Sequence, residues 1–369
     1  MSNLTNSFHF SPAFASPPLS WYFDDRIAAV EDRVLFRGGP NYVGHELMTP
    51  KVGDYCVLDW RGGGRVLVRH EGGVEWLSNV CRHRQALMLK GRGNVRNIVC
   101  PVHRWTYRLD GQLMGAPHFP DAPCLDLGKY PLARWNGLLF SGERDVAADL
   151  ADIAGVRELD FTGHVLDRIQ VDQYSFNWKT FIEVYLEDYH VVPFHPGLGS
   201  FVECDKLQWH FGERYSIQTV GIRDHLRRPG TPVYARWHDQ VLRYGNGTLP
   251  KHGAVWLTYY PNIMVEWYPG SLVISTVIPR GPEACTNVVE FYYPEEIALF
   301  EREYVEAEQA AYFETAVEDE EICTRITEGR RSLYLQGEEQ QGPYQSPMED
   351  GMLHFHEFLR RELLHHLAS

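Results

Sequence analysis

The chain has 369 residues, of which 44% are apolar and 23% charged, a composition typical of a soluble globular protein of about two domains. Its formal net charge of −14 argues against a surface that binds nucleic acid or anionic lipid. Seven cysteines, with no export signal in residues 1–18, predict reduced thiols and a cytoplasmic location. No run of about 18 apolar residues is found, so no membrane span is expected.

The first half of the chain has the pattern of a small antiparallel β domain. Short alternating apolar segments are separated by glycine-containing turns, at 62–64, 72–73 and 110–111. The apolar segments are 55–58, 65–69, 74–77 and 137–140. A stretch rich in Ala, Asp and Glu, at 145–160, is expected to be the domain junction.

The second half combines strands and helices. A helical stretch is predicted over 174–192, and a strand-rich region over 254–293 contains a turn at Pro269-Gly270. Two further helices are predicted over 295–329 and 349–367. Strands followed by helices indicate an α+β fold, with helices packed on one face of a sheet.

Two short segments carry four metal-ligating side chains. Cys81 and His83 form a Cys-x-His pair and, after 16 intervening residues, Cys100 and His103 form a Cys-x2-His pair. Such a set permits a structural Zn²⁺ site or a Rieske [2Fe–2S] centre, in which two His replace two Cys on one iron. Zinc fingers usually place both Cys on one knuckle and both His on a helix. The mixed pairing here favours the Rieske cluster, with zinc as the alternative.

The residues around these pairs resemble the Rieske domain of ring-hydroxylating and demethylating oxygenases. The resemblance implies that the two pairs hold a [2Fe–2S] cluster. Arg104 departs from the family, which usually has Gly at this position, and this leaves the cluster potential and reductase docking open. The resemblance rests on residues 79–84, 99–107 and 109–111.

A second group of metal-ligating types lies within residues 177–196. Its apolar residues recur at helical spacing, so an amphipathic helix is predicted in which Glu183, Glu187 and His190 share one face. Pro193 should end this helix just before itself, which lets His195 fold back beside His190. The apolar residues are Trp178, Phe181, Ile182, Tyr185 and Tyr189.

Two imidazoles and one carboxylate form the facial triad of non-haem Fe(II) oxygenases, which keeps positions open for dioxygen. Two His five residues apart are more often packed or surface residues, but a Rieske motif about 90 residues upstream strengthens the metal interpretation. His190 and His195 are therefore the first two expected iron ligands.

The third ligand is expected among the acids of 317–323. On a helix, Asp319 shares a stripe with apolar residues and should point inward, whereas Glu318 and Glu321 should be exposed beside Glu314 and Arg325. Glu320 stays ambiguous by spacing. Glu318-Asp319 followed by Gly329 is similar to the carboxylate-ligand helix of the family, and this resemblance implies Asp319 as the ligand.

The family resemblance also implies how electrons reach the iron. The cluster of one subunit serves the iron of its neighbour in a head-to-tail homotrimer, through an acid three residues before the first iron His, here Glu187. The alternative is that Glu187 only orients an imidazole. The implied partners are dioxygen and an NAD(P)H-dependent flavin/iron–sulfur reductase, acting directly or through a ferredoxin. Val184 is a further departure, because the family usually has Asn there.

The implied domains are an N-terminal segment at 1–44 that packs on the catalytic domain, a Rieske domain at 45–145, and a helix-grip iron domain at 146–369. The expected activity is mono- or dioxygenation, or demethylation, of an aromatic compound or an N-methylated or quaternary amine. The alternative is a Rieske electron carrier without oxygenase activity.

Two groups of side chains were weighed as substrate contacts. Five aromatic residues could form a cation–π cage or be ordinary sheet core. Arg223, Arg227 and Arg228 could meet a carboxylate or be exposed, and His354 and His356 are expected on a helix surface. The five aromatic residues are Trp256, Tyr259, Tyr260, Trp267 and Tyr268.

Overall fold

A computed structural model describes residues 16–121 and 123–367. The chain forms two compact units, Gly38–Ala148 and the combination of Met1–Arg37 with Asp149–Ser369. The first 15 residues of the expected N-terminal segment lie outside the described residues. Every helix within residues 16–121 and 123–367 is too short or too polar to span a lipid bilayer.

The unit Gly38–Ala148 is built from three small antiparallel sheets, as the alternating segments predict. Their strand orders are β1-β11-β10, β5-β2-β3-β4-β9 and β6-β7-β8. Val66, Val68, Leu77 and Ile98 fill the core between them and are almost fully buried. The strands are β1 (Asn41–His45), β2 (Asp54–Val57), β3 (Arg65–His70), β4 (Gly73–Ser78), β5 (Arg92–Asn94), β6 (Ile98–Val99), β7 (Thr106–Tyr107), β8 (Leu113–Gly115), β9 (Lys129–Tyr130), β10 (Ala133–Trp135) and β11 (Leu138–Ser141).

The second unit is centred on a seven-stranded antiparallel sheet of order β12-β18-β17-β16-β15-β14-β13. The predicted turn at Pro269-Gly270 joins β16 to β17, and Gly270 has a φ of +75°, a left-handed conformation that favours glycine. The strands are β12 (His164–Tyr174), β13 (Val202–Phe211), β14 (Tyr215–Ile222), β15 (Ala254–Tyr259), β16 (Ile263–Tyr268), β17 (Ser271–Gly281) and β18 (Ala284–Pro294).

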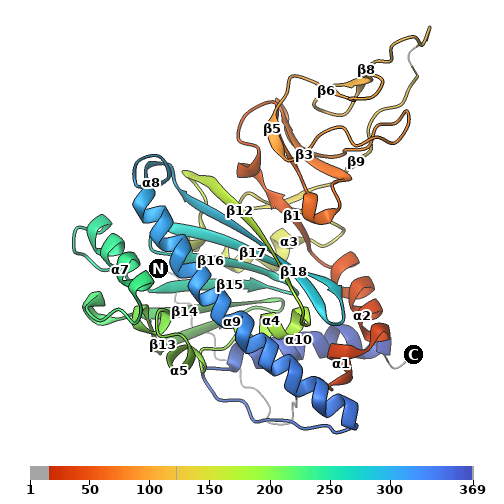
Figure 1. Cartoon of the computed structure of the whole chain (residues 1–369). Coiled ribbons are helices and arrows are strands. Elements are labelled where there is room, and N and C mark those ends of the chain that lie inside the picture. The colour runs from red at the N-terminus through yellow and green to blue at the C-terminus, as the bar shows by residue number, and fades with distance from the viewer. Residues whose placement is uncertain (1–15, 122, 368–369) are drawn as a thin grey trace. The chain divides into compact units, whose positions relative to one another are not determined.

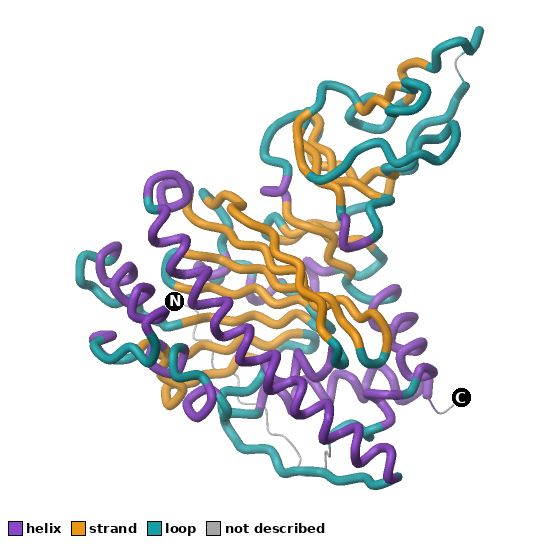
Figure 2. Tube along the Cα trace, in the orientation of Figure 1, coloured by secondary structure: helices purple, strands orange, loops and turns teal. Residues whose placement is uncertain are grey.

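Helices cover this sheet, and the long helix α9 runs diagonally across one face (Figures 1 and 2). Trp237, Phe291, Tyr304 and Val305 belong to the buried core shared by the sheet, α7 and α9. The arrangement confirms the predicted α+β class. The helices are α1 (Ser20–Phe23), α2 (Asp25–Glu31), α4 (Trp178–Tyr185), α5 (Val191–Phe194), α6 (Leu198–Phe201), α7 (Pro232–Tyr244), α8 (Glu295–Phe300), α9 (Arg302–Gln336) and α10 (Asp350–Leu367).

The predicted helix over 174–192 is wrong in its extent. It begins at Trp178, where Asn177 caps it by accepting a hydrogen bond from the Lys179 amide, and it ends at Tyr185. The chain is then irregular up to the short helix α5, which contains Pro193 in its first turn. Proline is tolerated there because first-turn amides lack an intrahelical acceptor. Tyr189 accordingly leaves the apolar stripe and is 60% exposed.

Candidate metal centres and the adjoining cavity

The four residues predicted to hold a cluster converge at two loops of the first unit. The His83 and His103 Nδ1 atoms lie 3.1 Å apart, and their ring centroids are separated by 4.6 Å. The Cys81 and Cys100 side chains are buried, whereas His103 is exposed. Two inward thiols and two converging imidazoles at the surface fit a Rieske [2Fe–2S] cluster.

The two loops share a backbone feature. The Gln85 amide donates to the Cys81 carbonyl and the Arg104 amide to the Cys100 carbonyl, each at 3.1 Å. Gln85 and Arg104 both have positive φ values, 56° and 63°. A left-handed residue therefore closes each loop four positions after its cysteine. This explains physically why glycine suits position 104 and why Arg104 is strained there.

An aromatic and a phenolic side chain support these loops. Trp105 stacks on His83 with a centroid separation of 5.0 Å. The Tyr107 hydroxyl lies 3.6 Å from the Cys81 Sγ and accepts a hydrogen bond from the Arg82 amide at 3.2 Å. Burial and the contact with Cys81 raise the pKa of Tyr107, so this phenol stays neutral beside the sulfur atom.

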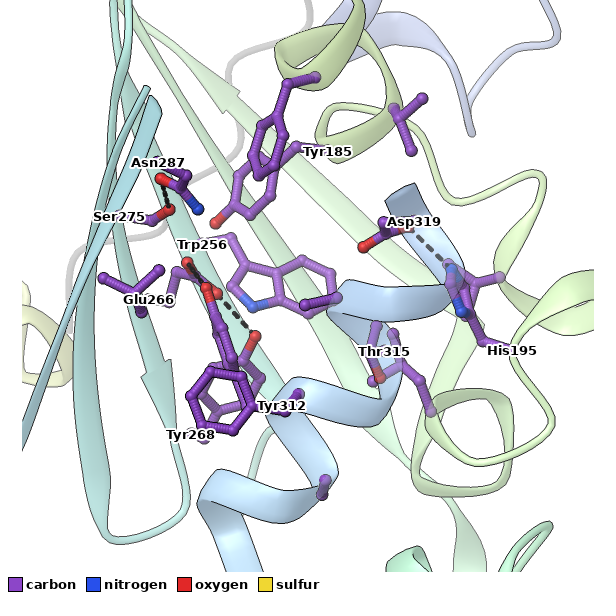
Figure 3. A pocket seen from close by; sticks show the side chains of 18 of the residues that line it. Tyr185, His195, Trp256, Glu266, Tyr268, Ser275, Asn287, Tyr312, Thr315 and Asp319 are labelled. Carbon is purple, nitrogen blue, oxygen red and sulfur yellow. Dashed lines mark hydrogen bonds and ion pairs between the residues drawn. The ribbon is translucent and has the colours of Figure 1, made fainter. Parts of the chain in front are cut away.

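His190, His195 and Asp319 form the candidate mononuclear centre. Each offers one ligand atom, and these atoms all lie within 4.8 Å of one another. The Asp319 Oδ1 is 3.0 Å from the His195 Nε2 and 3.5 Å from the His190 Nε2. The two imidazoles flank α5. The carboxylate of Asp319 comes from α9 and points towards His195 (Figure 3). Two imidazoles and one carboxylate fit a non-haem Fe(II) ion.

A further carboxylate holds the other ring nitrogen of each imidazole. The His190 Nδ1 contacts Glu187, whose second oxygen accepts from the His190 amide at 3.0 Å. The His195 Nδ1 lies 2.6 Å from the Glu318 Oε2. These contacts direct both Nε2 atoms towards Asp319. The prediction that Glu318 is exposed was therefore wrong, because the segment carrying His195 covers that face of α9. Helical spacing left open whether Glu320 points inward, and the structure shows that its side chain is exposed.

The charges at this centre favour a cation. Burial disfavours a charged imidazole at His190, but the hydrogen bonds of Asp319 and Glu187 outweigh it and raise the pKa of His190 to about 10. Burial likewise opposes ionisation of Asp319, yet the contacts with His190 and His195 lower its pKa. Positive charge is therefore stabilised where the three side chains meet.

The expected position of Glu183 needs correction. Glu183 does not share a face with Glu187 and His190. It is buried against Tyr22, Arg330 and His356, with the Arg330 Nη1 at 2.7 Å and the His356 Nε2 at 2.8 Å.

His354 and His356 are buried, and not on a helix surface as predicted. The reason is that α10 packs against α4 and the sheet, so this face of the helix meets protein and not water. His354 lies there with its Nδ1 at 2.9 Å from the Tyr260 hydroxyl.

A cavity adjoins the candidate iron centre and reaches to the sheet (Figure 3). None of the described residues that line it is Lys or Arg. Two of the five weighed aromatic residues line it, Trp256 and Tyr268. Arg223, Arg227 and Arg228 line a separate hollow. The carboxylates that line the cavity are Asp172, Glu187, Asp188, Glu266, Glu308 and Asp319.

Two family models match the chain. The ring hydroxylating alpha subunit (catalytic domain) matches residues 152–364, and the Rieske [2Fe–2S] domain matches residues 44–131. The match to the catalytic domain excludes a Rieske electron carrier without oxygenase activity. The match to the Rieske domain excludes a structural zinc site at the Cys and His pairs.

Several known proteins are similar along the whole chain. Putrescine 2-hydroxylase of Ralstonia nicotianae is 62% identical over 98% of this chain and 99% of the relative. Putrescine 2-hydroxylase of Bordetella bronchiseptica is 52% identical over 98% of this chain and 87% of the relative.

Solved structures share the fold at lower identity. The quaternary ammonium Rieske monooxygenase CntA, bound to L-carnitine, is 19% identical with a TM-score of 0.74 over 94% of this chain and 95% of that chain. Naphthalene 1,2-dioxygenase from Rhodococcus sp. is 19% identical, with a TM-score of 0.71 over 95% of this chain and 94% of that chain. The chain belongs to the Rieske non-haem iron oxygenases, as an alpha subunit with a [2Fe–2S] cluster and a mononuclear iron.

Proposed function

We propose that this chain is the terminal oxygenase of a putrescine hydroxylase that oxidises carbon 2 of the diamine. The single observation that carries the substrate is the 62% identity to a putrescine 2-hydroxylase over almost all of both chains. This replaces the expected aromatic or quaternary substrate with a primary diamine. The net reaction converts a C–H bond into C–OH and consumes dioxygen, two electrons and two protons, with water as the second product.

The lining of the cavity suits such a substrate. Putrescine is a dication with a four-carbon apolar middle, and the cavity offers carboxylates, aromatic walls and no Lys or Arg among its described lining residues. Carboxylates pair with ammonium groups, and aromatic faces accept both cations and methylenes. An anionic substrate would find no oppositely charged Lys or Arg among these described lining residues.

In this proposal Cys81, His83, Cys100 and His103 hold the cluster, and His190, His195 and Asp319 hold Fe(II). When bound, the two metal centres supply electron storage and dioxygen activation. The chain orients them. Glu187 and Glu318 each fix one imidazole through its Nδ1 atom, and the buried walls of the cavity keep bulk water from the reacting carbon.

Electrons are proposed to come from an NAD(P)H-dependent reductase and to pass through Glu187 between subunits of a homotrimer in the cytoplasm. The contact of Glu187 with the His190 Nδ1 supports this role, because it joins the carboxylate directly to a candidate iron ligand. A Rieske oxygenase needs such a reductase, since its own metals do not accept hydride from a nicotinamide.

The test is NADH-coupled oxygen uptake by the purified chain with a surrogate reductase. Putrescine should stimulate uptake and give one hydroxydiamine per dioxygen, identified by mass, whereas choline and benzoate should not. The Asp319→Ala variant should lose turnover and the mononuclear iron but keep the visible spectrum of the cluster. Absence of any hydroxylated product from putrescine, with both metal centres loaded, would reject the proposed substrate.

A further inference from the structure

We propose that Glu266 binds the ammonium group of the diamine that lies farther from the oxidised carbon, an inference that rests on the proposed function. Carbon 2 is separated from one nitrogen by one methylene and from the other by two. The remote ammonium must therefore be bound deeper in the cavity than the carbon facing the iron ligands. Glu266 lies on the sheet side of the cavity, across from Asp319 and His195 (Figure 3).

Glu266 is a buried acid without a cationic partner among residues 16–121 and 123–367. It lies on β16, is 2% exposed, and takes part in none of the ion pairs found among the described residues. Its two oxygens accept hydrogen bonds from the hydroxyls of Tyr268, at 2.7 Å, and Tyr312, at 3.3 Å. Burial raises the pKa of Glu266 to about 8, although both hydroxyls oppose this. A bound ammonium would supply the missing counter-charge.

Aromatic rings surround this carboxylate. The Trp256 and Tyr268 ring centroids are 6.2 Å apart, and those of Tyr268 and Tyr312 are 6.5 Å apart at an interplanar angle of 87°. Tyr185 continues the wall, with its ring centroid 6.3 Å from that of Trp256. Such rings attract an ammonium through their faces.

The phenol of Tyr185 is also buried close to this carboxylate. The Tyr185 hydroxyl is inaccessible to water and has no partner in the described part of the chain, although Tyr185 lines the cavity. An ammonium group has three N–H donors. One can be accepted by Glu266, and a phenol oxygen such as that of Tyr185 is an acceptor for another. Leaving a buried polar group unpaired is unfavourable, so this orphan hydroxyl itself points to a missing donor.

Glu308 is another buried carboxylate that lines the same cavity. It accepts hydrogen bonds from Tyr293 and, at 3.1 Å, from Ser271. Glu308 lies on α9, eleven residues before Asp319, which separates their Cα atoms by about 16 Å along the helix. Glu266 instead contacts Tyr312, which lies one turn nearer to Asp319 on the same helix. A chain of only four carbons favours the nearer acid.

The experiment compares Glu266→Gln with Glu308→Gln on two substrates, putrescine and butan-1-amine, which lacks the second charge. Glutamine keeps the size of the side chain and an acceptor oxygen but removes the charge. Glu266→Gln should raise the KM for putrescine about 100-fold, the size expected for breaking a buried ion pair. The KM for butan-1-amine should change little, so the preference for the diamine should fall by a similar factor.

Binding of putrescine measured by calorimetry should weaken in parallel, and the cluster spectrum and iron content should match the wild type. Glu308→Gln should keep the preference for the diamine. An unchanged preference in Glu266→Gln, or its loss in Glu308→Gln alone, would overturn the assignment. If the wild-type enzyme does not hydroxylate putrescine at all, the proposed function itself fails, which is a separate result.

Discussion

Arg104 shows how one residue can be strained and still be compatible with a metal site. Its φ of 63° costs a non-glycine residue about 1–2 kcal/mol, part of which is regained because arginine has less freedom than glycine in the unfolded chain. We expect Arg104→Gly to stabilise the protein by about 0.5–1 kcal/mol. Thermal unfolding followed by circular dichroism, with the cluster spectrum as the measure of loading, checks this.

Arg84 provides the matched control for Arg104. It is an exposed arginine in the other cluster loop, and it does not have a positive φ. Arg84→Gly should therefore leave the unfolding temperature unchanged or lower it. If Arg104→Gly also lowers the unfolding temperature, the guanidinium of Arg104 in the wild type stabilises the loop by more than its positive φ destabilises it.

Glu318 is the residue near the iron that spacing alone could not find. Its contact with the His195 Nδ1 fixes the ring, and losing such a support typically weakens metal affinity about 10- to 100-fold. We expect Glu318→Gln to release iron to a chelator at a correspondingly lower concentration. Glu321→Gln is the control, because Glu321 is exposed and pairs only with Arg325 among the described residues. Equal iron retention in the two variants would contradict this role of Glu318.

At the scale of elements, α4, α9, α10 and the N-terminal helices meet around one buried carboxylate. Glu183 of α4 pairs with Arg330 of α9 and His356 of α10, and it accepts from Tyr22 of α1. Burial alone would raise its pKa, but Arg330 and His356 outweigh burial and lower the pKa of Glu183 to about 2. The folded protein is thus stabilised by the ionised form.

This contribution has a defined pH dependence. Because the folded pKa lies below the unfolded value of about 4.3, the stabilisation is complete above that pH and is lost as the pH falls towards 2. Glu183→Gln should cost about 3 kcal/mol at pH 7, since it leaves Arg330 without its counter-charge. Urea unfolding should show that the difference in the free energy of unfolding between wild type and variant is smaller at pH 3 than at pH 7. A gap that is independent of pH would contradict the ionised pair.

Local patterns predicted the elements well where neighbours in sequence decide the structure. The turn at Pro269-Gly270, the long helix containing Asp319 and the closing helix all follow from turn chemistry and helical periodicity. The break after Tyr185 did not follow. The irregular segment that carries Glu187 and His190 is held by contacts with distant residues, such as the Asp188 amide donating to the Met348 carbonyl at 3.0 Å.

The same reason explains the residues whose environment was predicted incorrectly. Glu318, His354 and His356 look like surface residues on their own helices. They are covered by partners more than 90 residues away, including His195, Tyr260 and Glu183. The eight expected site residues stay a prediction. They were chosen from motifs that are local within each loop or helix, with Asp319 and Glu187 taken from the family resemblance. Which side chains assist them depends on packing that one sequence does not reveal.

At the scale of the whole molecule, the chain carries two metal centres in two compact units, and the predicted domain limits at 45–145 and 146–369 stay a prediction. The proposed homotrimer makes a separate demand. If electrons cross between subunits, an intact cluster and an intact iron centre need not belong to one chain. Cyclic symmetry then pairs each iron centre with the cluster of one neighbour.

Co-expression of two inactive variants tests this demand directly. Cys100→Ser lacks the cluster and Asp319→Ala lacks the iron, so neither homotrimer should turn over. Random mixed trimers should recover about one quarter of wild-type activity, because half of the iron centres are intact and half of their neighbouring clusters are intact. The control co-expresses Asp319→Ala with a variant that carries both Cys100→Ser and Asp319→Ala. These trimers contain no intact iron centre and should stay inactive. If differently tagged chains co-purify as trimers without any recovered activity, electrons pass within a single chain and Glu187 cannot be a bridge between subunits.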